Sequence, residues 1–142
     1  MMVITITRGT IHDYDIIPIL FDQAGEDSIE VNKQFFLNEN NIMLIAWKEC
    51  VPCGFLYGYL LESVHRRMPQ LFLYSIDVFA EHQNKGVGSR LVESFINLAK
   101  EKNCSEVFVI TNDHNVIAKK LYEGTGGQRD MLDEIMYIYP LV

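Results

Sequence analysis

Two glycines spaced Gly-x-Gly carry the clearest chemical pattern in this chain. They belong to the stretch Gln83, Asn84, Lys85, Gly86, Val87, Gly88 and Ser89. Glycine has no Cβ, so the backbone N–H groups beside it can approach an anion closely. If a helix starts here, its first turn adds unpaired donors and the positive end of its dipole. The stretch 83–89 therefore predicts a cradle for a phosphate or pyrophosphate group.

The flanking residues predict the elements that would position this cradle. Residues 71–78 are apolar and rich in β-branched and aromatic side chains, which is typical of a strand. From position 87 onward the apolar residues recur at helical spacing, at Val87, Leu91, Val92, Phe95, Ile96, Leu98 and Ala99. A strand should therefore run through the glycine turn into an amphipathic helix.

Spacing excludes two common phosphate-binding motifs. A P-loop requires Lys and then Ser or Thr after its last glycine, whereas Ser89 and Arg90 follow Gly88. A dinucleotide fingerprint requires a third glycine where Leu91 stands. Close packing of a helix on a strand would also select Gly-x-Gly, and the pattern alone does not decide between packing and binding.

The pattern Gln83-x-x-Gly86-x-Gly88, preceded by a strand that ends Ile76-Asp77-Val78, resembles the acetyl-CoA motif of the GNAT superfamily of N-acetyltransferases. Downstream, Asn115-x-x-Ala118-x-x-x-Tyr122-Glu123 resembles the second signature of the same family. The two motifs occur in the expected order, and the match covers most of residues 70–139. The resemblance implies acetyl-CoA as co-substrate and no metal.

The resemblance also implies roles for individual residues. The pyrophosphate would bind the backbone donors of residues 83–89, and the pantetheine arm would pair like an added strand with the backbone around Ile76 and Val78. Asn115 and Ala118 would belong to the same binding region. Tyr122 would protonate the departing thiolate.

The general base is the less defined part of the chemistry. Strand alternation over 71–78 puts Leu73, Ser75 and Asp77 on one face and Tyr74 on the other. Asp77 is the charged residue of an otherwise apolar strand, so it is our candidate to accept the amine proton directly or through water. A solvated strand end or an ion-pair partner is the alternative interpretation of Asp77.

Length and composition predict one small domain spanning residues 1–142. A chain of 142 residues can bury a core without disulfides. No apolar run approaches the roughly 20 residues that span a bilayer, so we expect a cytoplasmic protein that does not bind membranes. The three cysteines lack a second ligand pair, and we interpret them as bystanders.

Charge is unevenly distributed, and this bears on the acceptor. Residues 1–64 contain nine acidic and three basic side chains, whereas residues 65–142 contain ten and nine. In the GNAT plan the amino-terminal half lines the acceptor pocket, so Asp22, Glu26 and Asp27 would attract a cationic small-molecule amine. A solvated, solubilising surface is the alternative. The net charge of −7 argues against nucleic acid as a partner.

The order of elements predicts a mixed α/β domain (α+β in its segregation of strands). We expect a central sheet of about six to seven strands, splayed at the acetyl-CoA cleft and flanked by about four helices. The expected strands cover 3–7, 42–47, 54–61, 71–79, 107–111, 129–132 and 134–139. Helices should start after Thr10, after Ser28, at the glycine turn and after Asn115.

Within the superfamily, the chain is most similar to aminoglycoside 3-N-acetyltransferases, through residues 74–78, Glu81-His82-Gln83-x-x-Gly86, Ala118-x-x-Leu121-Tyr122 and the acidic loop 21–27. One departure is that the catalytic carboxylate of that group falls at Ser75, whereas the acid here is Asp77.

A function from another class, a non-catalytic acyl-CoA-binding sensor or interaction module, is equally compatible with the cradle. We interpret the apolar residues near position 140 as a core strand. The alternative interpretation is that they form the edge of a homodimer.

Overall fold

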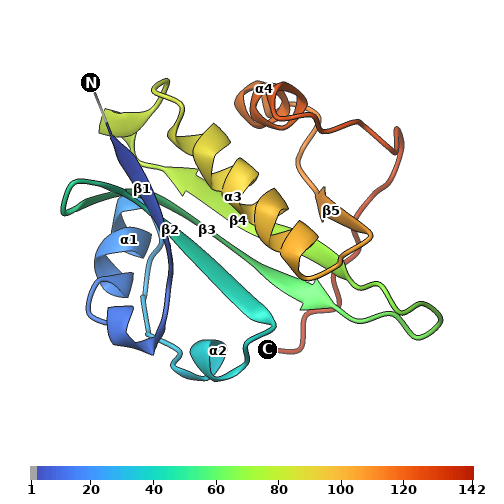
Figure 1. The fold of residues 1–142 in the computed structure, drawn as a ribbon, viewed down its shortest axis with the longest axis horizontal. Coiled ribbons are helices and arrows are strands. Elements are labelled where there is room, and N and C mark those ends of the chain that lie inside the picture. The colour runs from blue at the N-terminus through green and yellow to red at the C-terminus, as the bar shows by residue number, and fades with distance from the viewer. Residues whose placement is uncertain (1–2) are drawn as a thin grey trace.

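The computed structural model describes residues 3–142 and shows one five-stranded sheet in the order β1-β2-β3-β4-β5 (Figure 1). The first four strands pair antiparallel, and β5 joins β4 in parallel. The strands are β1 Ile4–Arg8, β2 Asn41–Lys48, β3 Val51–Leu61, β4 Gln70–Val78 and β5 Glu106–Val109. The mixed α/β class is confirmed, but the expectation of six to seven strands is wrong, because the sheet of the described residues has five.

Helix α3, Val87–Glu101, covers one face of the sheet. Its apolar stripe of Val87, Leu91, Val92, Phe95 and Ala99 is buried. This stripe packs on strand residues such as Leu56, Leu71 and Leu73, which are 1% exposed or less. Because α3 connects β4 to β5, it supplies the long crossover that a parallel pair of strands requires.

Helices α1, Ile17–Gln23, and α2, Gln34–Leu37, belong to the opposite face. Their apolar side chains pack with Met43, Ile45 and Phe55, which alternate along β2 and β3 with the residues that face α3. Helix α4, Val116–Gly124, lies beside α3 at the carboxyl end of β4 (Figure 1).

The helix expected after Thr10 is interrupted in the structure. The Thr10 cap is confirmed, because its side chain accepts a hydrogen bond from the His12 N–H. In turn, the Thr10 N–H donates to the Asp13 carboxylate at 2.8 Å. This cap opens only a 3-10 turn, Ile11–Asp13, and α1 starts separately at Ile17. Pro18 explains the restart, since proline is favoured in a first helical turn and breaks a helix interior.

The helix expected after Ser28 is wrong for most of its length. Ser28 has φ +52°, in the left-handed region, and residues 29–32 are irregular. Helical structure begins only at Gln34, whose N–H donates to Asn32 Oδ1. Strand β3 begins at Val51, three residues before the range 54–61 expected for it, because the chain already turns at Glu49, which has φ +58°.

The period-two alternation expected along β4 is wrong at one point. The β3–β4 register slips between Tyr57 and Gly58, so Tyr57 pairs with Ser75 but Gly58 pairs with Leu73. Tyr74 is the extra residue of β4 at this bulge and has no partner on β3. Leu73 consequently packs in the α3 core, while Ser75 and Asp77 pair with Tyr57 and Phe55 of the opposite cluster.

The strands expected at 129–132 and 134–139 are absent from the described structure, which explains the lower strand count. These residues form neither helix nor strand, and their large apolar side chains are exposed, so the interpretation as a core strand is wrong. Within residues 3–142, no helix combines the length and apolar character needed to cross a membrane.

Candidate active site

The glycine turn between β4 and α3 has the geometry of an anion cradle. Gly86 is the N-cap of α3 with φ +83°, and Asn84 has φ +61°. A Cβ at Gly86 would meet no atom within 4 Å, so its glycine is required by backbone conformation and the space in front of it is open. The first N–H groups of α3 face this space without a capping side chain.

Gly88 has a different reason for being glycine. A Cβ there would lie 3.3 Å from both Leu121 methyl groups and 3.7 Å from Val78 Cγ2. Close packing, one of the two alternatives that the sequence left open, therefore applies to Gly88, which allows α3 to pack closely against α4. Gly86 shapes the open turn, and its role in binding stays a prediction.

Side chains of the cradle stabilise the loop by donating to backbone carbonyl groups, and the Gln83 N–H donates to the Ala80 carbonyl at 3.4 Å. The Gln83 amide donates to the Val78 carbonyl at 2.9 Å, and Lys85 Nζ donates to the Glu81 carbonyl at 3.1 Å. Val87 is buried in the core and anchors the first turn of α3. Ser89 is half-buried in that turn.

The sheet opens next to the cradle. Strands β4 and β5 pair only over Gln70–Leu73 and Glu106–Val109, so the outer edge of β4 from Tyr74 to Val78 has no strand partner among residues 3–142. Ile76 and Val78, predicted to bind the pantetheine arm, lie on this open edge. An extended ligand can add to such an edge as a strand does.

Helix α4 brings the second motif to the same opening. The Asn115 side chain caps the helix by accepting from the Ala118 N–H at 3.0 Å. Tyr122 is on the face of α4 that packs against the α3 core, and burial raises the pKa of its phenol. The hydroxyl therefore keeps its proton at neutral pH and is suited to donate it.

Asp77 lies on the opposite face of the sheet from α3. It is half-buried and pairs in register with Phe55, which is 1% exposed. Burial raises the pKa of its carboxyl group. The carboxylate is thus a stronger proton acceptor than a solvated one, as a general base requires.

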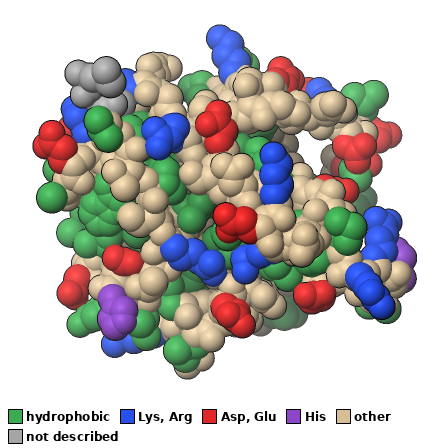
Figure 2. Space-filling model, in the orientation of Figure 1, with side chains coloured by type: hydrophobic (Ala, Val, Ile, Leu, Met, Phe, Trp, Pro, Cys, Tyr) green, Lys and Arg blue, Asp and Glu red, His purple; other side chains and the backbone are tan. Residues whose placement is uncertain are grey.

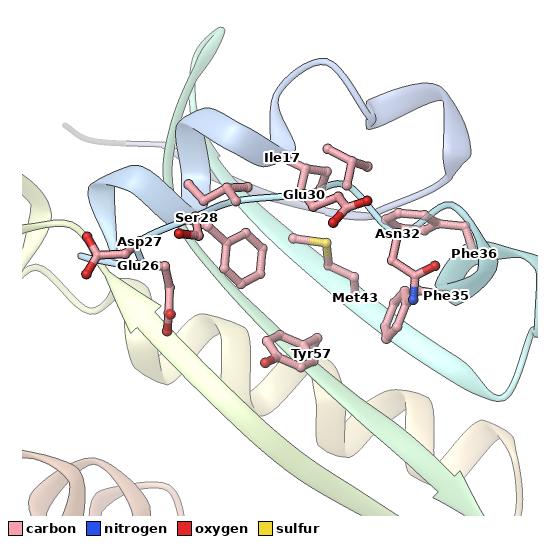
Figure 3. Close-up of a pocket in the computed structure, with 13 residues that line it drawn as sticks. Ile17, Glu26, Asp27, Ser28, Glu30, Asn32, Phe35, Phe36, Met43 and Tyr57 are labelled. Carbon is pink, nitrogen blue, oxygen red and sulfur yellow. The ribbon is translucent and has the colours of Figure 1, made fainter. Parts of the chain in front are cut away.

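A cavity of about 340 Å³ occupies the α1–α2 side of the sheet (Figure 3). Its apolar walls come from helix and strand residues that include Ile17, Phe21, Phe35, Phe36, Met43 and Tyr57. Its polar lining consists of Glu26, Asp27, Ser28, Glu30 and Asn32. The ring centroids of Phe21 and Phe55 are 4.7 Å apart. Because Phe55 pairs in register with Asp77, the cavity lies next to the strand position of Asp77.

The structure places two of the three acidic residues predicted to contact the acceptor in this cavity. Glu26 and Asp27 line the cavity, whereas Asp22 does not and is exposed on α1. In Figure 3 the Glu26 side chain extends toward the strands, while the Asp27 carboxylate points away from the aromatic rings. The pKa of Tyr57 is raised, mainly because its phenol is buried, and neighbouring Tyr59, Tyr74 and Glu26 raise it further.

Sequence reasoning missed the aromatic part of this cavity. Phe35 is 6.1 Å from Tyr57 and 6.0 Å from Tyr59, and Tyr57 is 5.5 Å from Tyr74, as ring centroids. The alternating aromatics of β3 were the available signal, but pocket lining depends on which face α1 and α2 leave uncovered.

A second cavity, of about 350 Å³, lies between β1 and α3 and is lined by residues that include Arg8, Ser94 and Glu101. No group of three or more His, Cys, Asp or Glu side chains in this range could hold a metal ion. Cys53 is buried in the core, Cys50 is exposed and Cys104 is half-buried. Basic and acidic side chains are interspersed over the face in Figure 2.

A family model described as the acetyltransferase (GNAT) family matches residues 12–126. The chain belongs to this family. The matched range contains the cradle, α4 with Tyr122, Asp77 and all the acidic residues of the cavity.

Among curated proteins, the GNAT chain is similar to a thialysine N-epsilon-acetyltransferase from Bos taurus. The two are 30% identical over 78 residues, which make up 54% of this chain and 46% of the relative. The chain spans less than half the length of the curated relatives it matches.

Solved structures share the fold over nearly the whole chain. An aminoglycoside acetyltransferase from an uncultured soil metagenomic sample, in complex with trehalose, superposes with a TM-score of 0.85 at 20% identity, covering 96% of this chain and 97% of that one. The aminoglycoside acetyltransferase AAC(6')-Iy, in complex with the bisubstrate analogue CoA-S-monomethyl-acetylneamine, gives a TM-score of 0.83 at 18% identity, covering 97% and 99%.

Proposed function

We propose that this GNAT chain transfers an acetyl group from acetyl-CoA to a primary amine of a cationic small molecule, by direct attack in a ternary complex. The observation that carries the proposal is the convergence of three features at the open edge of β4: the left-handed Gly86 turn, the unpaired strand 74–78 and the half-buried Tyr122. An aminoglycoside is the acceptor class we favour.

Binding of CoA would use backbone groups. The N–H groups at the start of α3 suit a pyrophosphate, since Gly86 leaves the space before them open. The free edge of β4 suits the amide groups of pantetheine. A thioester held along this edge supplies an activated acyl group.

The transfer requires two proton movements. The amine nitrogen attacks the thioester carbon, a C–N bond forms and the C–S bond breaks. Tyr122 gives its proton to the departing thiolate, and Asp77 takes the amine proton directly or through water. A backbone N–H near Val78 would stabilise charge on the carbonyl oxygen.

The acceptor would enter the cavity beside α1 and α2. Its acidic rim at Glu26, Asp27 and Glu30 attracts a cation, and its aromatic wall at Phe35 and Tyr57 offers ring faces to it. A polyamine sugar combines several ammonium groups with apolar ring faces, which suits this mixture better than an aliphatic monoamine would.

The test is thiol release from acetyl-CoA with aminoglycosides, polyamines and amino-terminal peptides, combined with calorimetric CoA binding on the same sample. We expect CoA binding and turnover with aminoglycosides. Binding without turnover on any amine would favour the sensor function instead, and absence of both would refute the assignment.

A matched pair of variants tests the cradle separately. Gly86 and Gly25 have nearly equal φ values of +83° and +86°, and both have open space around them. Gly86→Val should therefore abolish CoA binding, while Gly25→Val should strain its own turn without affecting CoA affinity. Equal affinities in the two variants would show that the Gly86 turn does not bind the pyrophosphate.

A further inference from the structure

An aromatic surface continues from the cavity across strands β3, β4 and β5. We call it the aromatic floor, and it consists of Phe35, Tyr57, Tyr59, Phe72, Tyr74 and Phe108. Each of these rings has a neighbour in the floor whose centroid lies between 4.6 and 6.0 Å away. Phe35 and Tyr57 also line the cavity, as Figure 3 shows. The cavity and the floor therefore form one continuous surface.

The aromatic floor is open to solvent although it lies on the middle of the sheet. Tyr74 is 56% exposed, and the other floor residues are half-buried. On the opposite face of β4, under α3, Leu71 and Leu73 are 1% exposed or less. An open aromatic surface that continues a cavity is suited to bind the apolar faces of a ligand.

The β4 bulge puts Tyr74 on the same face of the sheet as Asp77. In a regular strand, residues three positions apart point to opposite faces. Here the Tyr74 ring contacts those of Tyr57 and Phe72, on the face where Asp77 pairs with Phe55. Bulges of this kind re-aim a side chain beside an active site. The irregularity of β4 therefore aligns an exposed ring with the proposed base.

Negative charge decreases along this surface. Burial is the main cause of the raised pKa of both Tyr57 and Tyr59, but Glu26 adds to the effect only at Tyr57. Both phenols stay neutral at pH 7 and can hydrogen-bond to hydroxyl groups. The acidic rim of the cavity thus lies toward Tyr57, and the part of the floor around Tyr74 is uncharged.

We propose, on the basis of the proposed function, that Tyr74 is a specificity-determining residue whose ring packs on an uncharged face of a sugar ring of the acceptor, while the reacting amine lies at Asp77. Sugar rings have apolar C–H faces and hydroxyl edges, which suit aromatic rings that carry phenols. Three extended residues separate Tyr74 from Asp77 by about 10 Å. A single sugar ring is too short to reach both, so the acceptor carries linked rings.

Calorimetric binding without acetyl-CoA tests this role with kanamycin A and linear spermine, which contain the same number of amino groups. Tyr74→Ala should weaken kanamycin A binding about tenfold and leave spermine binding within about twofold, because only kanamycin A has ring faces to lose. Tyr74→Phe keeps the ring and should retain most of the affinity. Equal losses for the two amines, or no loss for kanamycin A, would overturn the proposal.

The single-ring diamine 2-deoxystreptamine tests the spacing. One ring held at Asp77 does not reach Tyr74, so Tyr74→Ala should leave the affinity for this amine within about twofold. A loss as large as that for kanamycin A would refute the arrangement with linked rings.

Tyr14→Ala is the matched control variant. Tyr14 is 43% exposed, and its ring lies 4.7 Å from Lys33 Nζ, outside the cavity lining. The variant should bind both kanamycin A and spermine as the unmodified chain does, and circular dichroism checks that all variants fold. If it loses as much kanamycin A affinity as Tyr74→Ala, the effect is not specific to the floor and the proposal is overturned.

Thiol release from acetyl-CoA separates this role from the proposed function. Tyr74→Ala should raise KM for kanamycin A about tenfold with little change in kcat, since Tyr74 does not contact the reacting atoms. Binding that depends on Tyr74, without thiol release, would support the specificity role and refute acetyl transfer to this class of amine. Thiol release with an unchanged KM in Tyr74→Ala would support the transfer and overturn the specificity role.

Discussion

Burial raises the pKa of both Tyr122 and Asp77 and favours the uncharged form of each, which suits the proposed acid and opposes the proposed base. For the phenol, a higher pKa extends the pH range in which it is a neutral proton donor. For the carboxyl group, a higher pKa penalises the charged form that the proposed base must adopt. The two side chains would therefore set opposite limbs of the pH profile of acetyl transfer.

Tyr122→Phe should lower kcat by about a hundredfold, the lower end of what a general acid contributes. CoA affinity should change little, because the proposed CoA contacts are backbone groups of β4 and α3. Steady-state kinetics with calorimetry measures both. An unchanged kcat would remove Tyr122 from the mechanism, and Tyr137→Phe, in the exposed C-terminal segment, is the matched control.

Asp77→Asn should lower kcat/KM and at the same time stabilise the fold at neutral pH. The folded-state pKa of Asp77 is raised, so the folded chain binds this proton more tightly than the unfolded chain does. The contribution of Asp77 to the free energy of unfolding is therefore largest below the unfolded-state pKa. It is lost as pH rises through the folded-state pKa. The asparagine amide carries no charge, so its burial does not include the free-energy cost of burying a carboxylate.

Thermal unfolding of the wild type and of Asp77→Asn between pH 3 and 8 measures the effect. The stability difference should grow with pH from near zero at the acid end. A pH-independent difference would show that packing, and not the charge, distinguishes the two. An unchanged kcat/KM would leave water or another group as the base.

At the scale of elements, local patterns predicted what local contacts determine. The strand, glycine turn and helix over 71–99 follow from contiguous periodicity and a left-handed glycine, and the structure contains all three. The Asn115 cap is also encoded by neighbouring residues. The β4 bulge lies instead where Gly58 comes close to Phe72 and Phe95, residues that no short window of sequence contains together.

The same distinction holds for the candidate site. The positions of the glycine turn and of Tyr122 on α4 were predictable because they belong to linear motifs, and their roles in binding and catalysis stay predictions. The aromatic cavity was not predictable, since Phe21, Phe35 and Tyr57 come from three elements that meet only in the folded chain. The helix expected after Ser28 failed because the chain there lines the cavity in an irregular path.

Gly58→Ala should destabilise the fold by about 3 kcal/mol, because overpacking a core forces backbone shifts. A Cβ at this position would clash with the Phe72 carbonyl oxygen and lie 2.8 Å from Phe95 Cζ. Gly124→Ala is the control: no atom lies within 4 Å of its Cβ position, and alanine favours the helix. Urea unfolding compares the two, and equal midpoints would refute the steric argument.

At the scale of the whole molecule, the net charge of −7 should affect acceptor binding more than CoA binding. Because nine of the acidic residues lie in the first 64 positions, beside only three basic ones, the side proposed to bind the acceptor would present a negative field to a cation. Raising salt from low to physiological ionic strength should therefore increase KM for a polycationic acceptor several-fold.

Kinetics at varied salt, with Glu26→Gln and Asp22→Asn as a pair, locates this field. Glu26 lines the cavity and Asp22 does not, although each carries one negative charge. The Glu26 variant should lose more of the salt dependence. Equal losses would indicate that the overall charge, and not the cavity, attracts the acceptor.

The contact between Gly88 and Leu121 makes the distance from the cradle to Tyr122 a fixed length. Leu121 precedes Tyr122 on α4, and its methyl groups approach within 3.3 Å of the position that a Gly88 side chain would occupy. If CoA binds as we propose, the two helices set a span that must equal the length of the pantetheine arm. A donor with a shorter or longer arm would bind by its nucleotide and still present its sulfur out of reach of the tyrosine.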